Sequence, residues 1–427
     1  MKVIVVGAGY VGLVAAACLS QSGHQVVCVD KNIKKIEALN NGIIPIYEEN
    51  LESIVRESLG NNNLQFSSKI FVSSDIDMII IAVGTPTLPD GRVDLSQVYN
   101  VFREIVNVVD HPIIVVMKST VPPGVGEKVK KVFLNKSKVP ISYISNPEFL
   151  REGQAVWDWY NPDRIVIGGD DRESIKKVLK LYSDIDAPRC IMDITSAEMV
   201  KYASNAFLAT KISFINEIAN LCELVGADIL PVAKAVGLDK RIGGQFLKAG
   251  LGYGGSCFPK DTRGLDFVST INGHTFNLLK SVIEVNFKQR IYAVRKLINH
   301  LGTINGKKVG VLGIAFKPNT DDTRESPAID IIKMLVDEGA DVVAYDPVVG
   351  SEQCPLPEEI TLTNNYEVAT KHAHALVICT EWPEILNIDW EEVAGHMRDP
   401  KVILDGRNCL SKSLLVELGF KYLGIGR

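Results

Sequence analysis

The sequence lacks the features that mark membrane-spanning, secreted and disulfide-rich proteins. No apolar run approaches the roughly 20 residues that a membrane-spanning helix needs. The opening segment MKVIVVGAGY has no separate basic region and no small-residue cleavage site. Eight cysteines are scattered through 427 residues without a CxxC pair, which argues against a disulfide framework and against a metal site. We therefore expect a cytoplasmic protein that holds no metal.

The sequence also lacks a strong excess of charge of either sign. Lysine and arginine total 46 against 51 aspartates and glutamates, a formal net charge of -5. This balance gives no electrostatic reason to expect nucleic acid or an anionic membrane as a partner. Hydrophobic residues make up 46% and charged residues 23%, which are ordinary values for a globular chain. The length predicts roughly three domains, or one large domain with additions.

Short apolar runs alternate with helical patterns at both ends of the chain. KVIVVG, a helical stretch and HQVVCVD open the sequence, and KKVGVLGIAF, another helical stretch and ADVVAYDP repeat that order later. Such alternation predicts an α/β fold with doubly wound parallel sheets. Between them, SAEMVKYASNAFLATKISFINEIANLCELVG reads as one long helix. We expect an α/β domain at 1–195, a helical middle domain at 196–300 and a second α/β domain at 301–427.

A glycine fingerprint follows the first predicted strand. Gly7, Gly9 and Gly12 fit GxGxxG at the start of a helix, and Asp30 follows the next strand. The glycines allow a tight turn and a close approach to a pyrophosphate, and the acidic residue can bind a ribose. Its charge would repel a 2′-phosphate, so the pattern favours NAD over NADP. The alternative is a glycine turn in an α/β domain that binds no nucleotide.

The second α/β domain has no complete fingerprint. GVLGIA keeps the first glycines and lacks the third, so a dinucleotide is disfavoured there. Lys317 and Arg324 follow this segment, near the predicted ends of strands, where they can bind the phosphates of a nucleotide. Solvated surface charges are the alternative for both residues.

A glycine-rich loop surrounds one of the cysteines. Cys257 lies in LGYGGSCFPKD, where glycines bring backbone N–H groups close to a ligand. Lys260 favours the thiolate, which is the nucleophilic form, and Asp261 can position that lysine or manage a proton. The pattern predicts either a catalytic cysteine or a structural thiol in a glycine turn.

Four further residues are candidates for the chemistry. Lys201 and Asn205 are four apart on the long helix, so they share one face and can stabilise an oxyanion, although a surface lysine and a solvated asparagine fit equally well. Glu148 and Thr120 follow strand-like runs, where open parallel sheets bind their ligands. Each of these two signals is weak alone.

An NAD site and an activated thiol together predict a reaction beyond simple alcohol oxidation. A thiol traps an aldehyde as a thiohemiacetal, and loss of hydride then gives a thioester that water hydrolyses. A primary alcohol would become an acid at the expense of two NAD molecules. The rival interpretations are a two-electron hydroxyacid dehydrogenase, which needs no thiol, and an NAD-binding sensor or scaffold without turnover.

The chain resembles the UDP-glucose/GDP-mannose dehydrogenase family of nucleotide-sugar 6-dehydrogenases along its whole length. The motifs that carry the resemblance are GAGYVG, GTPT, KSTVPPG, NPEFLREG, NPDRIVIGG, RIGGQFLKAGLGYGGSCFPKD, FKPNTDDTRESPA and DGRN. The resemblance implies two Rossmann-like domains joined by a long helix, a homodimer formed through the helical middle, and oxidation of UDP-glucose to UDP-glucuronate by two NAD. NPEFLREG and SCFPKD favour UDP-glucose; GDP-mannose and UDP-N-acetylhexosamines are the alternative substrates.

The resemblance also implies roles for individual residues. Cys257 resembles the nucleophile, Lys201 and Asn205 the oxyanion-stabilising pair, Asp261 the acid/base or water-orienting carboxylate, and Glu148 with Thr120 the groups that hydrolyse the thioester. The positions that match NAD contacts are Gly7, Gly9, Tyr10, Val11, Gly12, Asp30, Lys35, Thr85, Thr120, Glu152, Lys260 and Arg324. The positions that match substrate contacts are Glu148, Phe149, Leu150, Lys201, Asn205, Arg241 (across the dimer interface), Phe246, Leu247, Lys248, Ala249, Gly250, Tyr253, Gly254, Phe258, Lys317 and Arg407.

Overall fold

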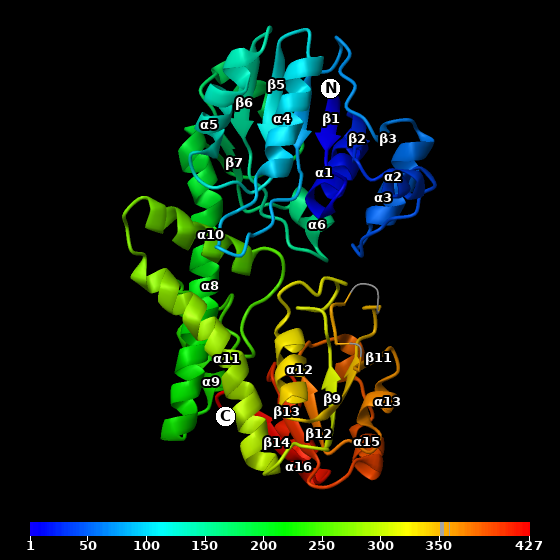
Figure 1. Ribbon diagram of the computed structural model, residues 1–427, viewed down its shortest axis with the longest axis vertical. Coiled ribbons are helices and arrows are strands. Elements are labelled where there is room, and N and C mark those ends of the chain that lie inside the picture. The colour runs from blue at the N-terminus through cyan, green and yellow to red at the C-terminus, as the bar shows by residue number, and fades with distance from the viewer. Residues whose placement is uncertain (351–353, 358) are drawn as a thin grey trace. The chain divides into compact units, whose positions relative to one another are not determined.

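The computed structural model describes residues 1–350, 354–357 and 359–427. The described chain divides into two compact units, each of which contains one sheet (Figure 1). The sheet of the second unit is entirely parallel, and that of the first unit is mainly parallel. The first unit comprises Met1–Ser204 with Phe267–Asn272, and the second comprises Asn205–Asp266 with Gly273–Arg427. The domain boundaries expected near residues 195 and 300 stay predictions.

The first unit is built on an eight-stranded sheet in the order β3-β2-β1-β4-β5-β6-β7-β8. All neighbouring strands pair in parallel except β6 and β7, which pair in an antiparallel manner. Because β7 is reversed, its first residues lie at the same edge as the carboxyl ends of β1 to β6. The strands are β1 (Lys2–Val6), β2 (Gln25–Val29), β3 (Leu64–Ser67), β4 (Met78–Ile81), β5 (Ile113–Met117), β6 (Ile141–Ser145), β7 (Ile165–Gly168) and β8 (Arg189–Met192).

The central strands of this sheet are covered on both faces. Along β1, Val3 and Val5 belong to one hydrophobic cluster, whereas Ile4 and Val6 belong to another. Alternate side chains point to opposite faces of a strand, so the continuous run of valine and isoleucine feeds both cores. Sequence segments of this kind are apolar at every position because neither face meets water.

Helices on the two faces complete the first unit. Figure 1 shows α4 (Ser96–Val108) lying across the face of the sheet at β5. The buried residues of α4 fall at helical spacing, and they pack in the same cluster as residues of β4 and β5. The other helical segments are α1 (Tyr10–Gln21), α2 (Ile33–Asn40), α3 (Leu51–Gly60), α5 (Val125–Val132), η1 (Leu134–Lys136), α6 (Ala155–Tyr160), α7 (Arg172–Leu179) and η2 (Lys180–Tyr182).

The sheet of the second unit repeats the strand order of the first. Its six strands run β11-β10-β9-β12-β13-β14, all in parallel, as β3-β2-β1-β4-β5-β6 do. They are β9 (Lys308–Leu312), β10 (Asp341–Tyr345), β11 (Thr361–Thr363), β12 (Ala375–Ile378), β13 (Val402–Asp405) and β14 (Lys421–Gly424). The helices between them are α12 (Pro327–Asp337), α13 (Tyr366–Thr370), α14 (Pro383–Leu386), α15 (Trp390–His396) and α16 (Lys412–Glu417).

The middle of the chain is helical, as the sequence predicts. The long helix α8 (Ile194–Val225) is followed by α9 (Ile229–Gly237), α10 (Phe258–Ile271) and α11 (Asn277–Leu301). The glycine-rich stretch before α10 is irregular, with positive φ at Gly252 and Gly255. The predicted fold class, two doubly wound α/β sheets with a helical middle that contains one long helix, is confirmed. Within the described residues, no helix combines the length and the apolar composition that crossing a bilayer requires.

Candidate active site

The turn between β1 and α1 has the shape of a dinucleotide cradle. Gly7 has a φ of +106°, and a Cβ there would lie 2.5 Å from the carbonyl oxygen of Ala82. A Cβ on Gly12 would lie 1.8 Å from the carbonyl oxygen of Gly7, so only glycine allows α1 to pack this close. A Cβ on Gly9 meets nothing within 4 Å, which leaves its side of the turn open. The open turn at a helix N-terminus fits the pyrophosphate of NAD.

Asp30 lies beside this turn, one residue after β2. Its carboxylate accepts the N–H of Ala8 at 3.0 Å and that of Asn32 at 3.0 Å, and the Lys35 ammonium lies 3.2 Å away. Burial alone would raise the pKa of Asp30, but these three groups together hold it below its ordinary value. Asp30 is therefore ionised at neutral pH, as a ribose-binding residue that excludes a 2′-phosphate requires.

The segments that follow β4, β5 and β6 bring further predicted residues together. Thr85 donates its hydroxyl to the carbonyl of Thr120 at 3.0 Å, which joins the GTPT and KSTVPPG segments. Tyr10 contacts the N–H of Gly153 through its hydroxyl, so the start of α1 is tied to the NPEFLREG segment. Val11 is half-buried next to it. These links bring the predicted cofactor residues of the first unit to one edge of its sheet.

Glu148 forms a buried ion pair at this edge. Its Oε1 lies 3.0 Å from the Nζ of Lys201 on α8, and its Oε2 accepts the N–H of Leu150 at 2.5 Å. The side chains of Glu148 and Lys201 are only 6% and 5% exposed. Burial would raise the pKa of Glu148, but the charge of Lys201, the N–H of Leu150 and the charge of Lys118 hold it below its ordinary value. A buried carboxylate kept ionised in this way can accept a proton or orient water.

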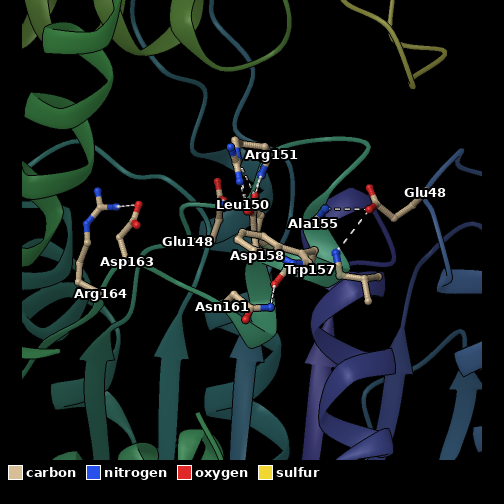
Figure 2. Close-up of polar contacts among 11 residues, drawn as sticks. Glu48, Glu148, Leu150, Arg151, Ala155, Trp157, Asp158, Asn161, Asp163 and Arg164 are labelled. Atoms are coloured by element: carbon tan, nitrogen blue, oxygen red, sulfur yellow. Dashed lines mark hydrogen bonds and ion pairs between the residues drawn. The ribbon is translucent and has the colours of Figure 1, made fainter. Parts of the chain in front are cut away.

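The aromatic ring of Phe149 lies between cationic groups. The guanidinium carbon of Arg164 lies 3.7 Å from the ring centroid, and the Lys201 Nζ lies 5.3 Å from it. Figure 2 shows the ion pair between Arg164 and its neighbour Asp163. Arg164 precedes β7 and reaches this edge because that strand is reversed.

Glu48 is a functional candidate that the sequence analysis missed. Its carboxylate accepts the N–H of Gly153 at 2.8 Å and that of Ala155, the first residue of α6, at 2.7 Å. Figure 2 shows the contact between Glu48 and Ala155. It thereby fixes the segment that carries the predicted cofactor residue Glu152, which is half-buried. A cavity of about 350 Å³ adjoins it, lined by Glu48, Glu49, Asn50, Arg151, Gln154 and Trp157. No recognisable motif marks Glu48, so only the fold reveals it.

In the second unit, Cys257 lies at the N-terminal end of α10. Its carbonyl accepts the N–H of Asp261 at 2.9 Å, its sulfur lies 3.5 Å from the Ser256 hydroxyl, and its side chain is half-buried. The partial positive charge of a helix N-terminus stabilises an anion such as a thiolate. All eight cysteines lie among the described residues, and none of them forms a disulfide. Burial raises the pKa of Cys28 and of Cys379 to about 12 each, so these thiols are unreactive.

Asp261 links the predicted catalytic residue Asn205 to the predicted cofactor residue Lys260. Its Oδ2 accepts the amide of Asn205 at 2.5 Å, and its Oδ1 lies 2.5 Å from the Lys260 ammonium. The Asp261 side chain is 1% exposed. The predicted Lys260–Asp261 contact is therefore present, and Asp261 fixes the orientation of the Asn205 amide as well.

The cysteine loop is held by packing that only glycine permits. A Cβ on Gly254 would lie 2.4 Å from the carbonyl oxygen of Glu325, and one on Gly255 would lie 2.7 Å from the ring of Phe316. Asn286 on α11 accepts the N–H of Tyr253 at 2.7 Å and donates to its carbonyl at 3.0 Å. The loop therefore packs against the FKPNTDDTRES segment, which contains Lys317 and Arg324.

The predicted substrate residues of the second unit differ in exposure. Leu247 and Ala249 are each 5% exposed and pack in a hydrophobic cluster, so only their backbone is available to a ligand. Gly250 donates its N–H to Asn216 at 2.8 Å, Phe246 has a φ of +63°, and Lys248 is exposed.

The aromatic and charged members of this set are also placed. Phe258 packs against Tyr253 and Phe246 with ring centroids 6.0 Å apart in both pairs. Lys317 is half-buried over the Phe316 ring. Each of the three predicted arginines forms an ion pair with an acidic residue. The pairs are Arg407 with Glu381 at 2.6 Å, Arg324 with Asp322 at 2.7 Å, and Arg241 with Asp239 at 2.6 Å.

No part of this arrangement suggests a metal site. Across 1–350, 354–357 and 359–427, no group of three or more histidine, cysteine, aspartate or glutamate side chains is arranged to hold a metal ion. The open glycine turn, the ionised Asp30 and the doubly wound sheet define an NAD-dependent oxidoreductase.

Comparison with known proteins narrows this class to one family. Family models match at residues 1–186 (the NAD binding domain), 195–288 (the central domain) and 310–412 (the UDP binding domain). The chain belongs to the UDP-glucose/GDP-mannose dehydrogenase family. The resemblance seen in its motifs is thus confirmed, and NAD is the cofactor.

Relatives match over the whole chain. The UDP-glucose 6-dehydrogenase TuaD of Bacillus subtilis is 44% identical over 430 residues, covering 100% of this chain and 93% of the relative. A UDP-glucose 6-dehydrogenase of Rhizobium meliloti is 43% identical, with 100% of both chains covered. The structure of a UDP-glucose dehydrogenase from Pyrobaculum islandicum matches with a TM-score of 0.92 at 39% identity, covering 100% of this chain and 97% of that one. A UDP-D-ManNAc dehydrogenase from Pyrococcus horikoshii matches with a TM-score of 0.90 at 28% identity, covering 100% and 99%.

Proposed function

We propose that the chain oxidises the C6 alcohol of UDP-glucose to the carboxylate of UDP-glucuronate, through a thiohemiacetal and a thioester on Cys257. The observation that carries the proposal is the half-buried Cys257 thiol at the N-terminus of α10, within a loop fixed beside the Asn205–Asp261 pair. A two-electron dehydrogenase has no use for such a thiol. The Gly7–Gly12 turn and Asp30 would hold NAD, which would accept one hydride in each oxidation, with a second NAD replacing the first NADH between them.

The first oxidation converts the alcohol to an aldehyde. The C6 hydroxyl loses its proton and the C6 carbon loses a hydride. Lys201 and Asn205 are the groups that stabilise the developing oxygen anion, by charge and by an amide N–H. Asp261 holds the Asn205 amide in place through their 2.5 Å hydrogen bond.

The second oxidation proceeds on the sulfur of Cys257. The thiolate adds to the aldehyde carbon, a C–S bond forms, and the oxygen takes up a proton to give the thiohemiacetal. Loss of a second hydride and of the hydroxyl proton leaves the thioester. Water then adds to the carbonyl carbon, the C–S bond breaks, and the carboxylate leaves while Cys257 regains its thiolate. Glu148, kept ionised by its surroundings, accepts a proton from that water. Thr120, which follows β5 as Glu148 follows β6, is proposed to orient the water.

The second unit supplies the groups that recognise the nucleotide sugar. Lys317 and Arg407 are the cationic residues for the diphosphate and sugar side, and the Phe246–Gly250 segment offers backbone groups. The relatives described as UDP-glucose 6-dehydrogenases are 44% and 43% identical, whereas the UDP-D-ManNAc enzyme is 28% identical, which supports glucose as the sugar. A UDP-N-acetylhexosamine or GDP-mannose is the alternative substrate for the same chemistry.

We further propose that the enzyme is a homodimer formed through α8. Phe207, Phe214, Leu221 and Val225 are 66%, 55%, 53% and 69% exposed, and their spacing puts them on one face of the helix. Large apolar side chains that are exposed on one face of a helix indicate a protein partner. Arg241, whose side chain is 88% exposed, is the residue proposed to reach the substrate of the partner subunit. A cytoplasmic location without nucleic acid or membrane partners stays a prediction.

The test measures products per substrate across a panel of UDP-glucose, UDP-N-acetylhexosamines and GDP-mannose. We expect two NADH per carboxylate with UDP-glucose as the best substrate. Cys257→Ser should abolish carboxylate formation, whereas Cys190→Ser, at a half-buried cysteine on β8, should leave it unchanged. One NADH per turnover, or carboxylate release by Cys257→Ser at near the wild-type rate, would contradict covalent catalysis. NAD binding without turnover of any sugar nucleotide would favour a sensor or scaffold instead.

A further inference from the structure

A buried lysine lies next to the proposed active site without a carboxylate partner. Lys118 follows β5, and its side chain is 4% exposed. Its ammonium donates to the Oδ1 of Asn146 at 3.2 Å and to the hydroxyl of Tyr182 at 3.1 Å. Within the described residues it forms no ion pair with an acidic side chain. Burial of an ammonium without a paired charge is costly, so its retention calls for a reason.

Aromatic rings offset part of that cost. The Lys118 Nζ lies 5.2 Å from the centroid of Trp159 and 5.7 Å from that of Tyr182. The negative faces of aromatic rings attract a cation, with more effect when water is excluded. The two rings therefore contact the Lys118 ammonium without cancelling its positive charge, as a carboxylate partner would.

The contacts of Lys118 also anchor the segment that carries Glu148. Asn146 accepts from both Lys118 and the Tyr182 hydroxyl, and its amide donates to the carbonyl of Val166 on β7 at 2.9 Å. Glu148 is two residues further along the chain. These three side-chain hydrogen bonds hold Asn146 in place and therefore limit where the Glu148 carboxylate can lie.

The positive charge of Lys118 also acts on Glu148 directly. The charges of Lys201 and, to a smaller extent, Lys118 lower the pKa of Glu148, and the N–H of Leu150 donates to its carboxylate. In the proposed reaction Lys201 stabilises the oxygen at C6, so its charge is shared with the substrate. Lys118 then remains as the cation that serves Glu148 alone.

We propose that Lys118 is a positioning residue of the reaction, whose buried ammonium fixes the Asn146–Glu148 segment and keeps Glu148 ionised while Lys201 engages the substrate. This inference rests on the proposed function, in which Glu148 is the base for thioester hydrolysis. It adds to that function a residue that touches neither substrate nor cofactor in the proposed mechanism.

The test compares pH profiles of kcat for NADH release from UDP-glucose. Without the cation, the pKa of Glu148 rises, so the acid limb of the profile should move up by about one pH unit in Lys118→Met. Glu148→Gln removes the titrating group. The acid limb of the kcat profile should therefore be the same in Glu148→Gln and in the double variant Glu148→Gln/Lys118→Met. The matched control is Lys128→Met, at an exposed lysine 5.6 Å from the ring of Tyr99, which should leave the profile unchanged.

Two further measurements keep the inference open to refutation. If Lys118→Met does not fold, Lys118→Gln keeps a donor for Asn146 and removes only the charge, so the same displacement is expected. In protein labelled with ¹³C at glutamate carboxyls, the titration midpoint of the resonance missing from Glu148→Gln should rise in the Lys118 variant. If neither the titration midpoint of Glu148 nor the acid limb of the kcat profile changes in the Lys118 variant, Lys118 does not have the proposed role. Failure of the proposed function would be seen separately, because the wild-type enzyme would then release no carboxylate. In that case the titration of the Glu148 resonance alone tests the role of Lys118.

Discussion

The Lys201 ammonium lies 3.0 Å from the Glu148 carboxylate, in an ion pair whose two side chains are only 5% and 6% exposed to solvent. Removal of one partner of a buried pair leaves a desolvated charge, whereas removal of both leaves none. We therefore expect Lys201→Met to lower the free energy of unfolding by about 3 kcal/mol, the lower end of the range for broken buried pairs.

The double variant Lys201→Met/Glu148→Gln should lose less stability than Lys201→Met alone. Urea unfolding followed by fluorescence measures both values. The variants are compared with one shared slope of unfolding free energy against urea concentration. An exposed pair, Lys176 with Glu173, supplies the control, because substitution of Lys176 should change the stability by less than about 1 kcal/mol. If the stability loss of the double variant equals the sum of the losses in Lys201→Met and Glu148→Gln, Lys201 and Glu148 are not coupled.

Glu198 makes the stability of the first unit depend on pH near neutrality. It is 2% exposed and accepts the N–H groups of Gly124 at 2.7 Å and Gly126 at 2.8 Å. Burial raises its pKa from 4.5 to about 7, although these N–H groups and the Tyr143 hydroxyl act in the opposite direction. The folded protein therefore binds this proton more tightly than the unfolded chain does. The stabilisation is complete below pH 4.5 and is lost as the pH rises through about 7.

Glu198→Gln should remove this change of the free energy of unfolding with pH. Between pH 5 and pH 8 the wild type should lose roughly 2–3 kcal/mol more stability than the variant, since one pKa unit corresponds to about 1.4 kcal/mol. Unfolding measured at both pH values gives the difference directly, whatever the absolute offset between the proteins. Glu173→Gln, at a side chain that is 74% exposed, is the control and should keep the wild-type slope. An unchanged slope in Glu198→Gln would show that the Glu198 carboxylate stays ionised in the fold.

The sequence predicts features whose cause is local, and it misses those that depend on distant partners. The Gly7–Gly12 turn and Asp30 follow from spacing, because a tight turn and a strand end are fixed by neighbouring residues. The short edge strands β3 and β11 carry too few residues to show a pattern. The reversal of β7 brings Arg164 to the ligand edge, and no periodicity in RIVIGG reports strand direction.

Contacts across long stretches of sequence explain the other omissions. Glu48 reaches Gly153 across 105 residues, and Lys118 reaches Tyr182 across 64, so neither shows a local motif. The side chains of Leu247 and Ala249 turn out to be core residues, because a motif match does not tell a backbone contact from a side-chain contact. Spacing alone therefore identifies the type of site, and the fold identifies the residues that support it.

Asp30 should set the preference for NAD over NADP. Its carboxylate holds the Lys35 ammonium at 3.2 Å, so Asp30→Ser removes the charge that repels a 2′-phosphate and leaves Lys35 able to pair with one. We expect the KM for NAD to rise about tenfold, as the loss of a charged hydrogen bond implies, and the kcat/KM ratio of NAD to NADP to fall by at least as much. Steady-state kinetics with both cofactors measure the change. Asp90→Ser, at an exposed aspartate paired with Arg92, should keep the wild-type ratio, and an equal ratio in both variants would rule out Asp30 as the determinant.

The exposed stripe of α8 should hold the dimer together. Phe214 is 55% exposed at its centre, and Phe214→Glu places a carboxylate where the proposed interface excludes water. We expect sedimentation equilibrium to give a mass near 46.8 kDa for this variant and twice that for the wild type. Phe71→Glu is the matched control, because Phe71 is 80% exposed in the first unit, away from the stripe in the sequence, and should leave the mass unchanged. If Arg241 serves the partner's substrate, Phe214→Glu should also lower kcat/KM for UDP-glucose at protein concentrations where the wild type is dimeric. A variant that keeps the wild-type mass would exclude α8 as the interface.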